Sequence, residues 1–173
     1  MQKEKSQIIE TVEKVMPAVV SITITESVGQ VEKEFAHIPK KRWARKQLEI
    51  PPDKIDAHGM VQIGGGSGFI VHSKGIILTN KHVLAGDGAR HTITLSTGES
   101  YDGEIVAKDP INDVAIFSIQ ARNPLPVVPL GNSAALQLGQ TVLAFGNALG
   151  IFQNTVSAGI IYGLSRSVSA YAD

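Results

Sequence analysis

Residues 64–84 constrain the fold most strongly, because two strand-like runs stand there on either side of a tight turn. Residues 67–72 and 76–79 are rich in β-branched and aromatic side chains, which favour strands. Between them, Ser73, Lys74 and Gly75 supply a turn, and Gly75 can adopt the positive φ that such turns need. The stretch therefore predicts a β-hairpin.

His82 follows directly after the second strand of this hairpin. A histidine at that position has a rigid base, and its ordinary pKa lies near neutrality, so it suits a general base. The residue types alone also fit a simpler interpretation, in which His82 only makes a local hydrogen bond at a strand end. Both interpretations remain open at this point.

Asp113 is a second candidate for a functional side chain. Residues 113–119 alternate as a largely apolar strand after the turn signal Asp109-Pro110, so Asp113 stands at the mouth of that strand. A carboxylate there is costly unless it is paired, and a histidine is a natural partner. The alternative is a solvated turn aspartate, which we expect Asp102 and Asp109 to be.

The remaining pattern is that of a β-protein with a short helix. Apolar residues recur at helical spacing within residues 2–16, and Pro17 ends the helix. Strand patterns cover residues 19–25, 91–97 and 101–108, and together with the hairpin they suffice for one antiparallel barrel. With 173 residues and 43% hydrophobic residues, one domain is the default, although two small barrels sharing a core also fit.

Residues 26–63 break the strand pattern and carry the basic run 40–46 around Trp43. Alone, this run fits a nucleic-acid or membrane patch, but neighbouring acidic residues dilute it and the net charge is zero. We therefore expect a solvated, mobile insertion. The chain has no cysteine and no apolar run of 18 residues. We expect no cofactor and no metal, and we expect four histidines to be ordinary surface residues: His37, His58, His72 and His91.

The two candidate motifs resemble those of HtrA/Deg-type serine proteases. Residues 79–83 (Thr-Asn-Lys-His-Val) are similar to that family's histidine motif, and residues 109–115 (Asp-Pro-Ile-Asn-Asp-Val-Ala) to its aspartate motif. The order and spacing agree from about residue 8 to residue 166, apart from the insertion. Further similar segments are residues 15–20, 66–70, 95–106 and 130–147.

This resemblance implies a trypsin-like double antiparallel β-barrel, an all-β fold with the first barrel complete, the second incomplete and a short N-terminal helix. The implied organisation assigns residues 1–18 to the helical segment and 19–122 to the first barrel, with 26–63 as a long inserted loop. Residues 123–139 form a connector with three prolines, and 140–173 begin the second barrel. Strands are expected at 140–145 and 154–164.

The resemblance also implies a serine endopeptidase of protein quality control, in which His82 and Asp113 are the catalytic base and its orienting carboxylate. The family's nucleophile lies in a Gly-Asn-Ser-Gly-Gly motif that these 173 residues lack. Ser133 is followed by two alanines, and we interpret it as the N-cap of a one-turn helix ending at Gly139. We therefore expect this chain to be inactive alone. The alternative is a non-catalytic pseudoprotease that acts as a binding or assembly module.

Partners and location follow from the same resemblance. It implies unfolded or misfolded polypeptides as substrates, no nucleic acid, and a homo-oligomer, a trimer in the parent protein. Half a second barrel leaves open strand edges, so a dimer or strand exchange is also expected here. The expected location of the parent is the bacterial cell envelope, periplasmic or membrane-anchored, although these residues contain no targeting signal and would meet a membrane only through an absent N-terminal anchor.

Overall fold

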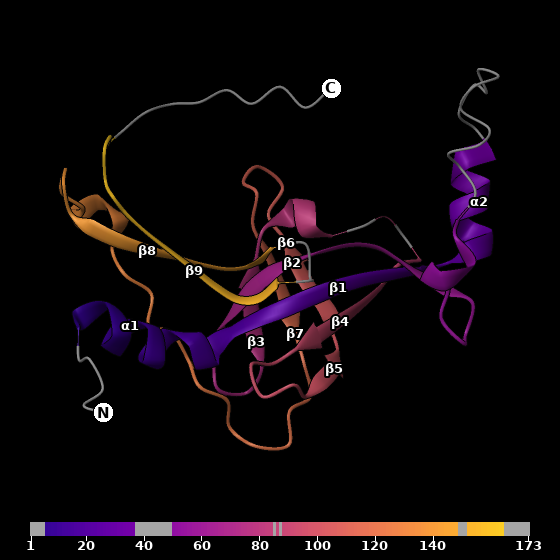
Figure 1. Ribbon diagram of the computed structural model, residues 1–173, viewed down its shortest axis with the longest axis horizontal. Helices are drawn as coiled ribbons and strands as arrows, with labels where there is room; N and C mark the ends of the chain where they lie inside the picture. Colours follow the sequence, from indigo (N-terminus) through magenta and orange to yellow (C-terminus); the bar gives the residue numbers. More distant parts are fainter. Residues whose placement is uncertain (1–5, 37–49, 85, 87, 149–151, 165–173) are drawn as a thin grey trace.

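A computed structural model describes residues 6–36, 50–84, 86, 88–148 and 152–164 (Figure 1). The basic run 40–46 lies outside the described residues. The main body is one sheet of seven antiparallel strands, in the order β5-β4-β1-β2-β3-β7-β6. These strands are β1 (Val19–Ser27), β2 (Met60–His72), β3 (Ile76–Thr79), β4 (Arg90–Thr94), β5 (Ser100–Asp102), β6 (Glu104–Lys108) and β7 (Ala115–Ser118).

The two edges of this sheet meet at Gly103, because β5 and β6 are one run of chain interrupted only by that residue. β5 pairs with β4 at one end of the strand order, and β6 pairs with β7 at the other. At the corner, the Gly103 amide donates to the carbonyl of His91 at 2.9 Å. The antiparallel sheet is thus strongly curled into a half-barrel, as the predicted all-β fold requires, and its two edge strands are continuous in the chain through the bend at Gly103.

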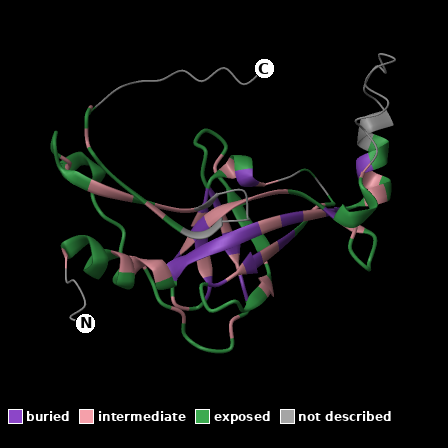
Figure 2. Ribbon diagram, viewed as in Figure 1, coloured by how far each residue is buried: buried purple, intermediate pink, exposed green. Residues whose placement is uncertain are grey.

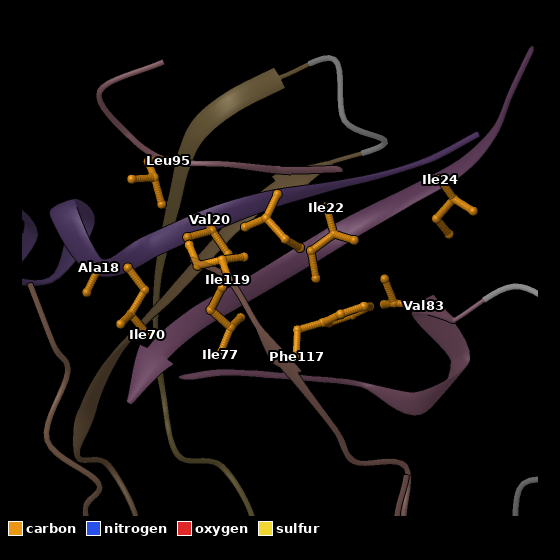
Figure 3. Packing of buried hydrophobic residues seen from close by; sticks show 11 residues of the cluster. Ala18, Val20, Ile22, Ile24, Ile70, Ile77, Val83, Leu95, Phe117 and Ile119 are labelled. Atoms are coloured by element: carbon orange, nitrogen blue, oxygen red, sulfur yellow. The ribbon is translucent and has the colours of Figure 1, made fainter. Parts of the chain in front are cut away.

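The core fills the inside of the curled sheet. On β1, Val20, Ile22 and Ile24 are buried, as their alternation predicts, and they meet Phe117 from β7. Figure 3 shows these side chains converging on the concave side of the sheet. Buried residues concentrate in this sheet, whereas the N-terminal helix and the last hairpin are mostly exposed (Figure 2). Burial of this apolar cluster is the main term that holds the strands in register.

The short N-terminal helix is also confirmed. Helix α1 (Gln7–Val15) begins at Ser6, whose hydroxyl accepts from the amide of Ile9 at 3.3 Å. Pro17 lies in the following 3₁₀ turn η1 (Met16–Ala18), so the α-helix ends where the proline predicts. The helix buries none of its residues, and Ile8 is 45% exposed. Among the described residues, no helix is long and apolar enough to cross a membrane.

The segment expected as an inserted loop is partly regular. β1 continues to Ser27, helix α2 (Val28–Ala36) follows it, and the turn η3 (Pro52–Lys54) precedes β2. Glu26 and Val31 are buried there, at 3% and 7% exposure. The 26–63 stretch therefore includes the far ends of β1 and β2, which project beyond the barrel and pair with each other.

The last hairpin, β8 (Thr141–Ala148) and β9 (Phe152–Ile160), forms a separate two-stranded sheet that contacts β1 and β2. β9 ends four residues before the expected boundary at 164. Ser133 is not an N-cap: the side chain of Asn132 accepts from the Ala134 amide, and Ser133 is the first residue of η5 (Ser133–Ala135). The one-turn helix is correspondingly shorter than predicted.

His91 is another correction, because it is 5% exposed rather than a surface residue. It lies on β4 opposite Ile24, and its ring stands 5.1 Å from that of Phe117. Its Nε2 is buried and has no hydrogen-bond partner within the described part of the chain. The pKa of His91 is lowered below its usual 6.5. Burial is the larger cause, and the nearby Lys108 ammonium is the second.

We predict that Gly103→Ala destabilises the barrel. A Cβ at residue 103 would lie 2.8 Å from Cγ1 of Ile93 and 3.2 Å from Cδ1 of Phe117, so core side chains must shift. Such overpacking costs about 1–3 kcal/mol, measurable as a lower urea midpoint. The control is Gly131→Ala, where an added Cβ meets nothing within 4 Å. Equal stability of the two variants would contradict the close packing of Ile93 and Phe117 against Gly103.

We also predict that stability falls in acid through His91. Because the folded-state pKa of His91 is depressed, the unfolded chain binds the proton more readily. The stabilisation is complete above about pH 6.5 and is lost as the pH falls below it. His91→Leu should flatten the pH dependence of the unfolding free energy between pH 7 and 5. The exposed His58, replaced by Gln, serves as control, and a dependence unchanged by His91→Leu contradicts the prediction.

Candidate active site

His82 is carried by a short turn whose base is fixed in the core. After β3 ends at Thr79, Asn80 is extended and residues 81–83 form the 3₁₀ turn η4 (Lys81–Val83). The Val83 amide donates to the carbonyl of Asn80 at 3.1 Å, and the Val83 side chain is buried in the core cluster. This anchoring leaves the His82 side chain outside, where it is 72% exposed.

Asp113 is placed by a turn that Asp109 organises. The Asp109 carboxylate accepts from the amides of Ile111 at 2.8 Å and Asn112 at 2.7 Å, while its own amide donates to the carbonyl of Val114. These hydrogen bonds lower the pKa of Asp109, and the bond from the Asn112 amide has the largest effect. Asp109 is therefore the organiser of the turn, which goes beyond the solvated role expected for it.

The β3–β7 pairing brings the two candidate residues together. Thr79 is the last residue of β3, and it stands opposite Ala115, the first residue of β7. The segment that follows β3 and the segment that precedes β7 therefore lie side by side. Residues 31 positions apart in the chain are joined in this way at one end of the sheet.

The two side chains are in direct contact. Nδ1 of His82 lies 2.6 Å from Oδ2 of Asp113, and the backbone amide of His82 donates to Oδ1 at 2.8 Å. Since an ionised carboxylate only accepts, Nδ1 carries the proton and Nε2 is left as the basic nitrogen. The bond from the His82 ring is the largest cause that lowers the pKa of Asp113, followed by the bond from its amide.

Two further residues of this region were not singled out from the sequence. Nζ of Lys81 donates to the carbonyl of Asp109 at 2.9 Å, and Nδ2 of Asn80 donates to Asp113. Both belong to the Thr-Asn-Lys-His-Val segment at residues 79–83, and that motif is the signal that could have found them. Asp102, expected as solvated, pairs with Arg90 at the surface through two hydrogen bonds.

An apolar cleft of about 430 Å³ adjoins the site, between the barrel and β8. Asn80 and Asp113 line it together with Phe69, Leu78 and Phe145. Among the described residues, no group of three His, Cys, Asp or Glu side chains could hold a metal ion. With Nδ1 bound to Asp113, the exposed His82 ring can accept a proton at Nε2.

Comparisons with known proteins give one consistent answer. The family model described as "Trypsin-like peptidase domain" matches residues 66–173. The mitochondrial serine protease HTRA2 of Bos taurus is 42% identical over 106 residues, which are 61% of this chain and 23% of the relative. Serine protease HTRA1A of Danio rerio is 34% identical over 154 residues, 89% of this chain and 26% of the relative.

A protein of Marinomonas sp. named as a DegP-like periplasmic serine endoprotease is 34% identical over 173 residues. That alignment covers 92% of this chain and 35% of the relative. The chain therefore spans roughly a quarter to a third of the length of these three relatives.

We predict that His82→Ala raises the pKa of Asp113, because the variant removes the hydrogen bond that lowers it most. The carboxyl titration is measured by NMR on a chain carrying ¹³C-labelled aspartate. Asp109 is the internal control, since its lowering bonds come from residues 111 and 112 and its titration should stay in place. An unmoved Asp113 titration would show that the two side chains are not paired in solution.

Proposed function

Because the chain belongs to the trypsin-like peptidase domain family, and within it to the HtrA/Deg-type serine proteases, we propose that His82 and Asp113 serve peptide-bond hydrolysis. In this proposal His82 is the general base, and Asp113 orients it. The activity is that of a serine endopeptidase, to which this chain contributes two of the three triad residues.

One observation carries the proposal: Asp113 holds both the ring and the backbone of His82, at 2.6 and 2.8 Å. A carboxylate that only needed a surface hydrogen bond would not require both contacts. The pair fixes the tautomer and the orientation of the imidazole, as a triad carboxylate does. The 72% exposure of the His82 side chain keeps it accessible to a third group.

The reaction follows from this arrangement. A serine hydroxyl attacks the peptide carbonyl while Nε2 of His82 takes its proton, and the resulting imidazolium is stabilised by the Asp113 carboxylate. His82 then returns the proton to the leaving amine, and an acyl-enzyme remains. Water, activated by the same nitrogen, releases the acid and regenerates the serine.

The nucleophile is not among these residues, because the 173-residue sequence contains no Gly-Asn-Ser-Gly-Gly motif. Ser133 does not replace it, because this serine is the first residue of the short 3₁₀ turn η5, which lies in the proposed connector. We propose that the 173-residue chain alone is inactive, and that residues 19–122, 123–139 and 140–173 are the first barrel, the connector and the start of the second barrel.

Substrates, assembly and location are further parts of the proposal. The names of the relatives support polypeptide substrates, for which we propose unfolded chains. The name of the Marinomonas relative supports a location in the cell envelope. Among the residues that the structure describes, β8 and β9 pair only with each other, so their outer edges can pair with another chain, which supports a homo-oligomer.

The test uses unfolded casein as substrate. The purified 173-residue chain should not cleave it, whereas the chain extended by a segment that completes the second barrel and carries a Gly-Asn-Ser-Gly-Gly motif should. In the extended protein, His82→Ala should lower kcat by a factor on the order of 10⁴–10⁶, while His58→Ala should change it little. If casein cleavage by the extended protein persists in His82→Ala, the cleavage comes from an unrelated hydrolytic contaminant. That result would favour the alternative, in which this chain is a binding or assembly module.

A further inference from the structure

Asn80 stands at the N-cap of η4, yet its side chain does not cap that turn. Asparagine is among the residues preferred at N-caps, because its side-chain oxygen can accept from an amide of the following turn. Here the backbone is extended, with φ −79° and ψ 143°, and only the backbone carbonyl of Asn80 closes the turn. The side chain is used elsewhere.

The Asn80 amide nitrogen is directed at Asp113. Nδ2 donates to the Asp113 carbonyl at 3.0 Å and to its Oδ2 at 3.2 Å. Both partners are acceptors only, so the orientation of the amide group is fixed: its NH₂ faces Asp113. One side chain therefore ties the backbone and the carboxylate of Asp113 together.

The carboxylate is then held at both oxygens. Oδ1 accepts from the His82 amide, and Oδ2 accepts from the His82 ring and from Asn80. Without Asn80, the side of Oδ2 away from His82 would be hydrated, because the Asp113 side chain is 49% exposed. A freely hydrated carboxylate can rotate and break the alignment of Oδ2 with Nδ1.

We propose that Asn80 is a positioning residue for the Asp113 carboxylate, which it holds in the plane that suits His82. This inference rests on the proposed function, since it assigns Asn80 a part in preparing the same base. Asn80 touches neither substrate nor nucleophile in this role and acts only through Asp113.

Lys81 provides the matched control. It lies next to Asn80 and binds the same turn, but through the carbonyl of Asp109 and not through the carboxylate of Asp113. Lys81→Met therefore loosens the contact between the two segments and leaves the three donors to Asp113 in place. A general loss of order in the turn would appear in both variants, whereas loss of positioning appears only at Asn80.

The experiment compares Asn80→Ala, Asn80→Ser and Lys81→Met in the 173-residue chain. Two signals are read by NMR: the titration of the Asp113 carboxyl and the low-field proton on Nδ1 of His82. Serine keeps a capping oxygen but is too short to reach Asp113, so a capping role predicts wild-type behaviour for Asn80→Ser. The positioning role predicts the same change in both Asn80 variants.

The expected result is a higher Asp113 titration midpoint and a weakened or lost Nδ1 proton signal in Asn80→Ala and Asn80→Ser, with neither change in Lys81→Met. Wild-type signals in both Asn80 variants would overturn the inference. The Asp113→Asn variant distinguishes failure of the Asn80 inference from failure of the proposed function. If it abolishes the proton signal while the Asn80 variants do not, only the role of Asn80 fails. If it leaves that signal unchanged, the His82–Asp113 pair itself is absent and both proposals fail.

Discussion

The pairing of β3 with β7 is the constraint on which the rest of the site depends. Its register sets Ile77 opposite Phe117 and Thr79 opposite Ala115, and both members of the first pair are fully buried. A shift by one residue would turn the buried side chains toward solvent, so burial enforces the register. The same register fixes which residues follow β3 and precede β7 at the end of the sheet. The core packing that sets the register of β3 and β7 therefore also sets the geometry of the site.

The curl of the sheet extends this dependence to the strands beyond β7. β7 pairs with β6 on its other side, and β6 continues through Gly103 into β5, which pairs with β4. A side chain at the corner would push on Ile93 and Phe117, and Phe117 belongs to the strand that carries Asp113 at its start. The absence of a side chain at Gly103 therefore affects where the Asp113 carboxylate lies, just before β7 begins.

The sequence carried enough information for the strands and for the two principal site residues. Period-two alternation located β1 and β4, and Gly75 marked the turn between β2 and β3, where its φ is +92°. His82 and Asp113 were found because each follows or precedes an apolar strand. Their pairing was a hypothesis that a 31-residue separation could not settle, since it depends on which strands become neighbours.

Other features were predicted wrongly or depend on tertiary contacts that no local pattern encodes. Period-two alternation places His91 on the same face of β4 as the buried Ile93 and Leu95, so the spacing pointed to burial, and the surface prediction was wrong because it followed the polar residue type instead. Asn132 and Ser133 are both good N-caps, and the choice between them is set by one hydrogen bond. Asn80 stands two residues before His82 in the sequence, and the hydrogen bonds of its side chain depend on where Asp113 lies.

The origin of the donors to Asp113 determines how the site is assembled. Within the part of the chain that the structure describes, the hydrogen bonds to its carboxylate come from residues 80 and 82, and the turn that carries it is closed by residues 109–114. None of these groups belongs to β8 or β9, although β8 borders the neighbouring cleft. Within the described residues, His82 and Asp113 are therefore positioned by the seven-stranded sheet and its turns. In the proposed function, a serine that approaches His82 would meet an imidazole whose tautomer Asp113 has already set.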